Sequence, residues 1–289
     1  MLDKARLSAE TLRLLPRKRV SRALGSAAAQ RLPAPILAAA VHGYARVLDV
    51  DLGEAEVPAG GYGSFDAFFT RRLRPGARPV DPDPKALVCP ADGVLEDAGT
   101  IDAEGGLIIK GRPYTVRALL GEEGAERYAD GLYALIYLSP RDYHRVHAPV
   151  SGPVRERRYL EGTLYPVNDI GVRYVPRLFA RNERVAVVQA SAAFGDVTTV
   201  LVGAIGVGSI GLAFEEGRTN AGEGDPVFAP PVRRYTEAAP ELGRADELGV
   251  FHLGSTVIVF ASPAAALRLS VAPGTPVRMG QALARQEQP

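Results

Sequence analysis

Beyond residue 86, the sequence is built from short apolar runs separated by turn residues. The runs are rich in valine, isoleucine and aromatic residues, which favours buried strands over helices at this length. Proline and glycine recur between them in a loose repeat, at 90–93, 149–152 and 273–280, so the strands are expected to join through tight turns. The sequence therefore predicts a mainly antiparallel β-sandwich or barrel. The expected strands cover 86–89, 132–138, 185–189, 197–204 and 257–260.

The N-terminal stretch is helical in pattern and basic. Leucines recur at helical spacing between Ser8, where a helix is expected to begin, and Pro16, where it should end. Two more helices are expected at 20–32 and 35–47. His42 falls inside the last of these, among apolar residues, and is expected to be structural rather than catalytic.

Two interpretations of these helices remain open on composition alone. Basic amphipathic helices bind anionic lipid surfaces well. The same helices can instead cover the domain behind them, with their arginines in solvent. We expect an α+β chain, in which residues 1–60 form membrane-facing basic helices and residues 61–289 form a β-rich domain.

Charge and cysteine content exclude several classes of protein. A net charge of +1 over 289 residues gives no overall field that would attract nucleic acid. Cys89 is the only cysteine, which excludes an intrachain disulfide and a multi-cysteine metal site. No apolar run reaches the roughly 20 residues needed to cross a bilayer, and the first residues lack the apolar core of a secretion signal. The expected location is the cytosol or the cytosolic face of a membrane.

An aromatic segment joins the two parts of the chain. Ser64 is expected to cap a short helix that has Phe65, Phe68 and Phe69 on its apolar side. The arginines that follow can bind an anion such as phosphate, or they can be surface charge beside an aromatic cluster. These arginines are Arg71, Arg72, Arg74 and Arg78.

A glycine pattern at Gly206–Gly211 formally matches a dinucleotide-binding loop. Such a loop needs a following helix whose N-terminus faces the pyrophosphate. Residues 212–225 contain further glycines and an asparagine, which disfavour a helix. We therefore reject nucleotide binding and expect the glycines to allow close packing in the β core.

The segment 137–149 is the richest in chemistry-bearing side chains. It places His144 and His147 three residues apart after a strong strand, and histidine suits proton transfer near neutral pH. The pair also suits a metal, but no third ligand is evident, so a metal is not expected. Separate acid–base duties fit better, with Asp142 able to orient one of the two rings.

Near the C-terminus, Gly254 and Ser255 open an apolar strand. Glycine leaves its carbonyl unshielded, and the serine hydroxyl lies next to that carbonyl, so a base could drive attack on the peptide bond itself. Most Gly-Ser pairs are only strand entrances. Asp92, within a turn, could supply a carboxylate to orient a histidine base. The Gly-x-Ser-x-Gly elbow of an α/β-hydrolase is absent around Ser255.

Five motifs, in order and at matching spacing, resemble the phosphatidylserine decarboxylase family. The Leu-Gly-Ser-Thr form of the last is similar to the bacterial type of that family. Residues 1–50 resemble this family in general character more than in specific motifs. The motifs are Phe68–Arg71 with Pro79, Pro90–Gly93, Tyr137–His147, Phe179–Arg184 and Leu253–Thr256.

The resemblance implies a self-cleaving proenzyme that converts phosphatidylserine to phosphatidylethanolamine and carbon dioxide. Asp92, His147 and Ser255 would form the processing triad that cuts the bond between Gly254 and Ser255. A β chain of residues 1–254 and an α chain of residues 255–289 would result. Ser255 would become a covalent pyruvoyl group that takes the substrate amine as a Schiff base. Spacing alone does not separate the histidines, and the resemblance makes His144 the proton donor in decarboxylation.

The resemblance also implies partners and a location. Val167, in a stretch similar to the family's site, would contact the substrate. The family forms homodimers and acts at the cytoplasmic side of the cell membrane as a peripheral protein.

Hairpins punctuated by proline and glycine also resemble those of lipoyl- and biotinyl-carrier folds, although the lysine that those domains modify is missing.

Three alternatives remain. A pyruvoyl enzyme for a soluble amino acid derivative would use the same chemistry without a membrane. A Ser-His-Asp hydrolase would keep Ser255 within an intact chain. A non-catalytic lipid-binding β domain would need neither histidine. Only the pyruvoyl enzymes predict a break at Ser255.

Overall fold

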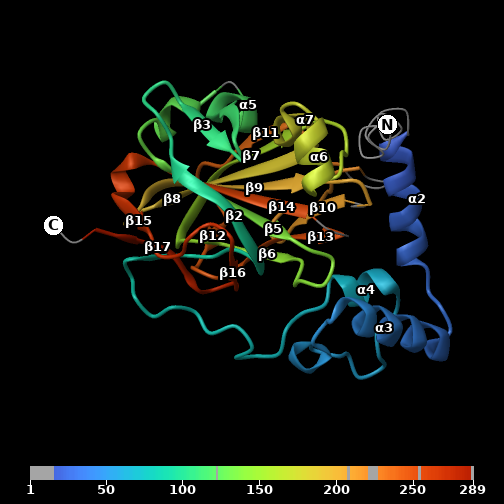
Figure 1. Cartoon of the computed structure of the whole chain (residues 1–289). Coiled ribbons are helices and arrows are strands. Elements are labelled where there is room, and N and C mark those ends of the chain that lie inside the picture. The colour runs from blue at the N-terminus through green and yellow to red at the C-terminus, as the bar shows by residue number, and fades with distance from the viewer. Residues whose placement is uncertain (1–15, 122, 207–208, 221–226, 253–254, 288–289) are drawn as a thin grey trace.

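The computed structural model describes residues 16–121, 123–206, 209–220, 227–252 and 255–287. The helix expected between Ser8 and Pro16 therefore lies outside the described residues. All pairs of neighbouring strands in the sheets are antiparallel. Together with the N-terminal helices, they make a sheet-rich α+β fold (Figure 1).

The largest sheet carries the core. Its central strand β14 lies between β5 and β9, and residues Val257, Ile258 and Phe260 on it are fully buried. Burial of both faces explains why this run is apolar throughout rather than alternating. The strands in order are β11 (Val232–Arg234), β7 (Gly152–Leu160), β8 (Arg184–Ser191), β9 (Gly195–Gly203), β14 (Ser255–Ala261), β5 (Leu132–Leu138), β2 (Gly93–Thr100) and β16 (Thr275–Val277), with β12 (Glu241–Leu242) also paired to β7.

This sheet does not close into a barrel within the described residues, since β11 and β16 are its two ends. The predicted strands are confirmed, whereas the barrel alternative is not. The likeness to carrier-domain hairpins stays a prediction. Smaller sheets complete the β part: β10 (Ser209–Leu212), β13 (Glu247–His252) and β6 (Arg145–His147); β1 (Ala86–Val88), β17 (Ala282–Gln286) and β15 (Leu267–Leu269); and the hairpin β3 (Gly106–Ile109) with β4 (Arg112–Thr115).

The end of the glycine pattern, where the chain is described, lies in strand β10, which pairs with β13. Residues 213–220, which follow, contain no helix. A dinucleotide loop would have no helix N-terminus to offer there.

Helices α2 (Arg17–Ala29) and α3 (Ala34–Leu48) confirm two of the expected N-terminal helices, with ends shifted by a few residues. In Figure 1, α3 lies with α4 (Phe65–Phe69) below the sheets and α2 runs alongside them. Ser64 caps α4 as expected, since its hydroxyl accepts a hydrogen bond from the backbone N–H of Ala67 at 3.1 Å. The remaining helices are α5 (Val116–Leu120), α6 (Asp169–Tyr174), α7 (Leu178–Arg181) and the 3₁₀ turns η1 (Leu52–Glu54), η2 (Ala125–Tyr128) and η3 (Pro263–Ala265).

A second, smaller core holds α3 and α4 together. Phe68 is fully buried against Leu37, Val41 and Ala45 of α3. Helix α2 instead touches the β part, where Lys18 forms ion pairs with Glu161 and Glu183. Among the described residues, no helix is both long and apolar enough to cross a membrane.

Candidate active site

Ser255 is the first residue of the central strand β14. Its backbone pairs with Leu138 on one side and Gly203 on the other. Its side chain is 1% exposed, and its hydroxyl oxygen is buried with no hydrogen-bond partner. Buried hydroxyls normally find partners, because desolvation without one costs about 1–3 kcal/mol. An orphaned hydroxyl at a rigid strand start therefore suggests a role in chemistry. Gly254 lies outside the described residues.

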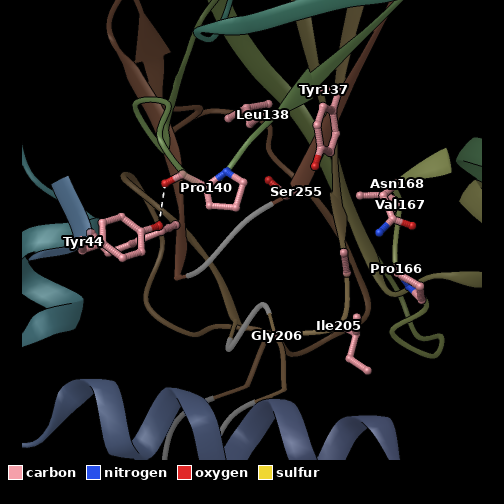
Figure 2. A pocket seen from close by; sticks show the side chains of 12 residues that line it. Tyr44, Tyr137, Leu138, Pro140, Pro166, Val167, Asn168, Ile205, Gly206 and Ser255 are labelled. Atoms are coloured by element: carbon pink, nitrogen blue, oxygen red, sulfur yellow. Dashed lines mark hydrogen bonds between the residues drawn. The ribbon is translucent and has the colours of Figure 1, made fainter. Parts of the chain in front are cut away.

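Ser255 opens into a largely apolar pocket of about 280 Å³. Figure 2 shows Ser255, Tyr137 and Val167 around the same space. Val167 is 5% exposed and lines this pocket, so the structure brings it together with Ser255. Helix α3 also contributes to the wall, since Tyr44 donates a hydrogen bond from its hydroxyl to the carbonyl of Pro140 at 2.7 Å. Helix α3 is thus part of the wall of this pocket.

His144 is fully buried and carries a free nitrogen. Its Nδ1 donates to the carbonyl of Asp142 at 2.8 Å, which leaves Nε2 as the lone-pair nitrogen, and that atom has no hydrogen-bond partner. The ring packs on Phe69 with centroids 4.1 Å apart. Burial, helped by the charge of Arg71, lowers the pKa of His144 to about 3. His144 is therefore a neutral imidazole at physiological pH.

His147 has both ring nitrogens occupied. Nδ1 donates to the carbonyl of Ala245 at 2.7 Å, and Nε2 accepts from the hydroxyl of Tyr143 at 3.0 Å. Burial lowers its pKa as well, although the Ala245 carbonyl opposes that effect. His147 is thus held in one tautomer by its neighbours.

Asp92 lies near His147 through the backbone, because the N–H of His147 donates to the carbonyl of Pro90 at 2.8 Å. Its carboxylate, however, accepts hydrogen bonds from Arg78, at 2.6 Å from Nη2, and from the backbone N–H of Met279 at 2.9 Å. Among the described residues, Asp92 makes no hydrogen bond to either histidine. The predicted triad members form no hydrogen-bonded relay among the described residues; the structure links Asp92 to His147 only through the backbone at Pro90.

The expectation that Asp142 orients a histidine holds for its backbone only. Its carbonyl receives Nδ1 of His144, whereas its carboxylate accepts from the backbone N–H and hydroxyl of Ser139, at 2.7 and 2.8 Å. Burial raises the pKa of this carboxyl group. Sequence spacing could not separate these two uses of one residue.

Three residues contact the predicted site residues although their sequence patterns did not assign them to that site. Phe69 covers the ring of His144, Tyr143 occupies His147, and Arg78 binds Asp92. Tyr143 stands four residues before His147, but only the folded turn shows that they touch. The arginine cluster fits neither sequence interpretation fully, since Arg71 is 5% exposed and packs over Phe68, whereas the side chain of Arg72 is 66% exposed.

Among the described residues, no three histidine, cysteine or acidic side chains lie close enough to hold a metal ion. The predicted site residues are instead a serine and two buried histidines. Together the fold and the site define a sheet-rich protein with an unpartnered serine hydroxyl in an apolar pocket, an arrangement of the kind that nucleophilic catalysis uses.

Comparison with known sequences identifies the family. The sequence profile described as phosphatidylserine decarboxylase matches residues 65–285. A phosphatidylserine decarboxylase proenzyme of Brevibacillus brevis is 40% identical over 94% of this chain and 95% of its own length. The proenzymes of Anaeromyxobacter sp. strain K and Bordetella petrii are 40% and 42% identical, over 96% and 98% of this chain and 98% and 99% of theirs. The chain belongs to the phosphatidylserine decarboxylase family.

Proposed function

We propose that this protein decarboxylates phosphatidylserine to phosphatidylethanolamine and carbon dioxide, after cutting its own chain between Gly254 and Ser255. The observation that carries the proposal is the buried hydroxyl of Ser255, which has no partner and lies at the start of a rigid strand in an apolar pocket. Family membership supports it, and the relatives are named as proenzymes.

In the proposed cleavage, a base takes the proton of Ser255 while its oxygen attacks the carbonyl of Gly254. The amide becomes an ester, and β-elimination then releases the Gly254 carboxylate. Water replaces the remaining nitrogen, which leaves as ammonia, so a ketone is formed without an oxidant. We assign the base to His147, oriented by Asp92. In this assignment, Nε2 of His147 must exchange the Tyr143 hydroxyl for that of Ser255, and Nδ1 must exchange the Ala245 carbonyl for the carboxylate of Asp92.

The position suits a pyruvoyl group, because the Ser255 hydroxyl from which it would form is a buried polar group without a partner in this pocket. The group would supply an electron sink for the charge left by departing carbon dioxide. The apolar walls would exclude water and receive the lipid. His144 would return the proton to carbon. Because His144 is neutral, it must first bind a proton, and its Nδ1 contact with the Asp142 carbonyl orients it for that task.

The proposed location is the cytoplasmic face of the cell membrane, bound peripherally. Supporting residues are the apolar side chains that α2, α3 and their connection leave in solvent beside arginines. They are Leu24, Leu32, Ile36 and Val47, between 41% and 80% exposed. We also propose that the protein forms a homodimer. Residues 1–60 would form its membrane-facing part and residues 61–289 its catalytic part.

Denaturing mass spectrometry of the purified protein tests the central claim. Two chains that separate between Gly254 and Ser255 are expected, with the second beginning in a pyruvoyl group. Ser255→Ala should remain one chain. Ser262→Ala, at the other end of the same strand, is the matched control and should cleave normally. An active, unbroken wild-type chain would overturn the proposal and favour the hydrolase.

Two further measurements separate the remaining alternatives. Activity on phosphatidylserine vesicles but not on soluble serine derivatives would exclude the soluble pyruvoyl enzyme. For the membrane, Ile36→Asp with Val47→Asp should weaken flotation with anionic vesicles. Ile108→Asp, equally exposed on the distant β3 hairpin, should not. Unchanged flotation of the first variant would remove the proposed role of α3.

A further inference from the structure

Helix α4 contacts the active site at two points on one face. Asp66 and Phe69 are three residues apart, so their side chains lie on the same side of the helix. Phe69 packs against the ring of His144. Asp66 reaches a different segment, the end of strand β13. Phe68, on the next face, anchors the helix in the second core, so α4 is a fixed support.

The contact of Asp66 is with His252. Nδ1 of His252 lies 2.9 Å from both carboxylate oxygens of Asp66, across 186 positions of sequence. The two side chains are 20% and 22% exposed, so the contact is partly shielded from water. His252 precedes Gly254 by two residues and had no role in the sequence analysis.

The backbone around His252 explains why a side-chain contact matters there. On the β6 side of β13, Val250 pairs with Arg145, and the backbone N–H of Phe251 donates to the carbonyl of His144 at 3.0 Å. Among the described residues, His252 itself has a strand partner on one side only, Ser209 of β10. Ser255, in contrast, is paired on both sides. The Asp66 carboxylate adds a side-chain contact at the residue that has one strand partner.

We propose that the Asp66–His252 pair is a positioning pair for self-cleavage. It fixes the chain ahead of Gly254 so that the Gly254 carbonyl stays within reach of the Ser255 hydroxyl. Neither residue takes part in proton transfer. Rates of intramolecular attack depend steeply on such placement, with losses of up to about a hundredfold for an ångström-scale shift. The inference rests on the proposed self-cleavage.

Cell-free synthesis of the full chain, followed by gel separation of precursor and products over time, measures the cleavage rate. Asp66→Ala and His252→Ala should each slow cleavage roughly tenfold. The double variant should be no slower than the slower single variant, because one contact is lost in all three. His252→Asn, which keeps an N–H donor near the position of Nδ1, should recover most of the rate.

Asp196→Ala is the matched control. It removes the Arg127–Asp196 ion pair, 2.9 Å long, in which Asp196 is similarly shielded at 17% exposure. Its cleavage rate should equal that of the wild type. Thermal unfolding of each variant in the uncleavable Ser255→Ala chain shows whether Asp66→Ala and Asp196→Ala cost similar stability.

The outcomes separate this inference from the proposed function. A wild-type chain that never cleaves refutes the proposed function. If the wild-type chain cleaves and the Asp66 and His252 variants cleave at the same rate, only the positioning role of the pair is refuted. Equal slowing of Asp66→Ala and Asp196→Ala, or strictly multiplicative effects in the double variant, would also refute the pair, because a general loss of stability would then explain the rates.

Discussion

Two cavities share Tyr137 in their walls. They differ in whether the polar groups that line them have hydrogen-bond or ion-pair partners. One is the apolar pocket of about 280 Å³ that contains Ser255. The other is a polar cavity of about 420 Å³ that contains Asp92, Arg78 and Glu54. In the polar cavity, Arg78 bridges the two carboxylates at 2.6 and 2.7 Å. In the apolar pocket, the Ser255 hydroxyl has no partner.

This difference indicates where reactivity and where stability reside. The hydrogen bond from Arg78 lowers the pKa of Glu54, so the charged form of that carboxylate is stabilised. A buried hydroxyl or imidazole nitrogen without a partner has lost its hydrogen bonds to water, and no hydrogen bond within the protein replaces them. Such atoms, here on Ser255 and His144, are stabilised only when a reaction partner arrives. The apolar pocket thus contains the unpartnered hydroxyl of Ser255, whereas in the polar cavity Arg78 holds Asp92, the proposed orienting carboxylate, in place.

The largest expected effects on rates come from substitution of the two histidines. His147→Ala should slow self-cleavage by roughly 10²–10⁴-fold, the usual contribution of a general base. His144→Ala should cleave normally but lose decarboxylation to a similar degree. Gel analysis of cleavage and release of carbon dioxide from labelled lipid measure the two steps. The reverse pattern would exchange the two roles and make the unpartnered Nε2 of His144 the base.

Arg78→Met tests whether the polar cavity is structural. The substitution leaves Asp92 buried with its charge uncompensated by arginine, which should cost about 3 kcal/mol of unfolding free energy. Urea unfolding in the Ser255→Ala chain measures it. Arg278→Met removes a contact to the same Glu54 from a side chain that is 67% exposed, so it should cost well under about 1 kcal/mol. Equal losses would contradict the structural assignment.

The buried histidine should make the fold sensitive to acid. Because the pKa of His144 is about 3 in the folded chain, below its ordinary value of 6.5, the unfolded chain binds more protons between these values. Stability is therefore complete above about pH 6.5 and falls as the pH drops toward 3. Between pH 7.5 and 5.5, the Ser255→Ala chain should lose about 1 kcal/mol through this residue.

His144→Leu in the Ser255→Ala chain should flatten that dependence, as followed by urea midpoints at each pH. His42→Gln, on the exposed side of α3, is the control and should leave the slope unchanged. A slope that His144→Leu does not alter would show that the imidazole is not held neutral.

The smallest expected effect concerns the wall of the apolar pocket. Val167→Ala removes two methyl groups from a buried position that faces Ser255 across the pocket. KM for phosphatidylserine should rise about threefold with little change in kcat, because the lost packing contributes equally to the ground state and the transition state. Val57→Ala, 52% exposed outside the pocket, should change neither. A fall in kcat instead would place Val167 closer to the reacting atoms.

Local patterns predicted the strands and the N-terminal helices well. Strand β5 covers Leu132–Leu138 as expected, because a continuous apolar run of that length is buried on both faces. The cap at Ser64 also followed from residue type alone. Such features depend on neighbours in the sequence, which the sequence states directly.

The site was predictable as a set of residues but not as a set of contacts. Ser255, His144 and His147 were singled out by their motifs. That Asp92 binds Arg78, or that Tyr143 occupies His147, depends on which side chains long-range packing brings within 3 Å. Several acceptors compete for each donor there, and burial decides among them. The Asp66–His252 contact, between distant segments, had no local signature at all.

The central position of β14 in the main sheet affects how the protein could refold after cleavage. A break before Ser255 would separate residues 255–289, yet that fragment would still supply the middle of the main sheet through β14, an edge through β16, and two of the three strands, β17 and β15, in the sheet that contains β1. The pieces would stay interlocked in the native state. Once denatured, they would have to find each other by diffusion, so recovery would become bimolecular and dependent on concentration. Maturation would convert a chain that can refold by itself into an assembly that is built only once.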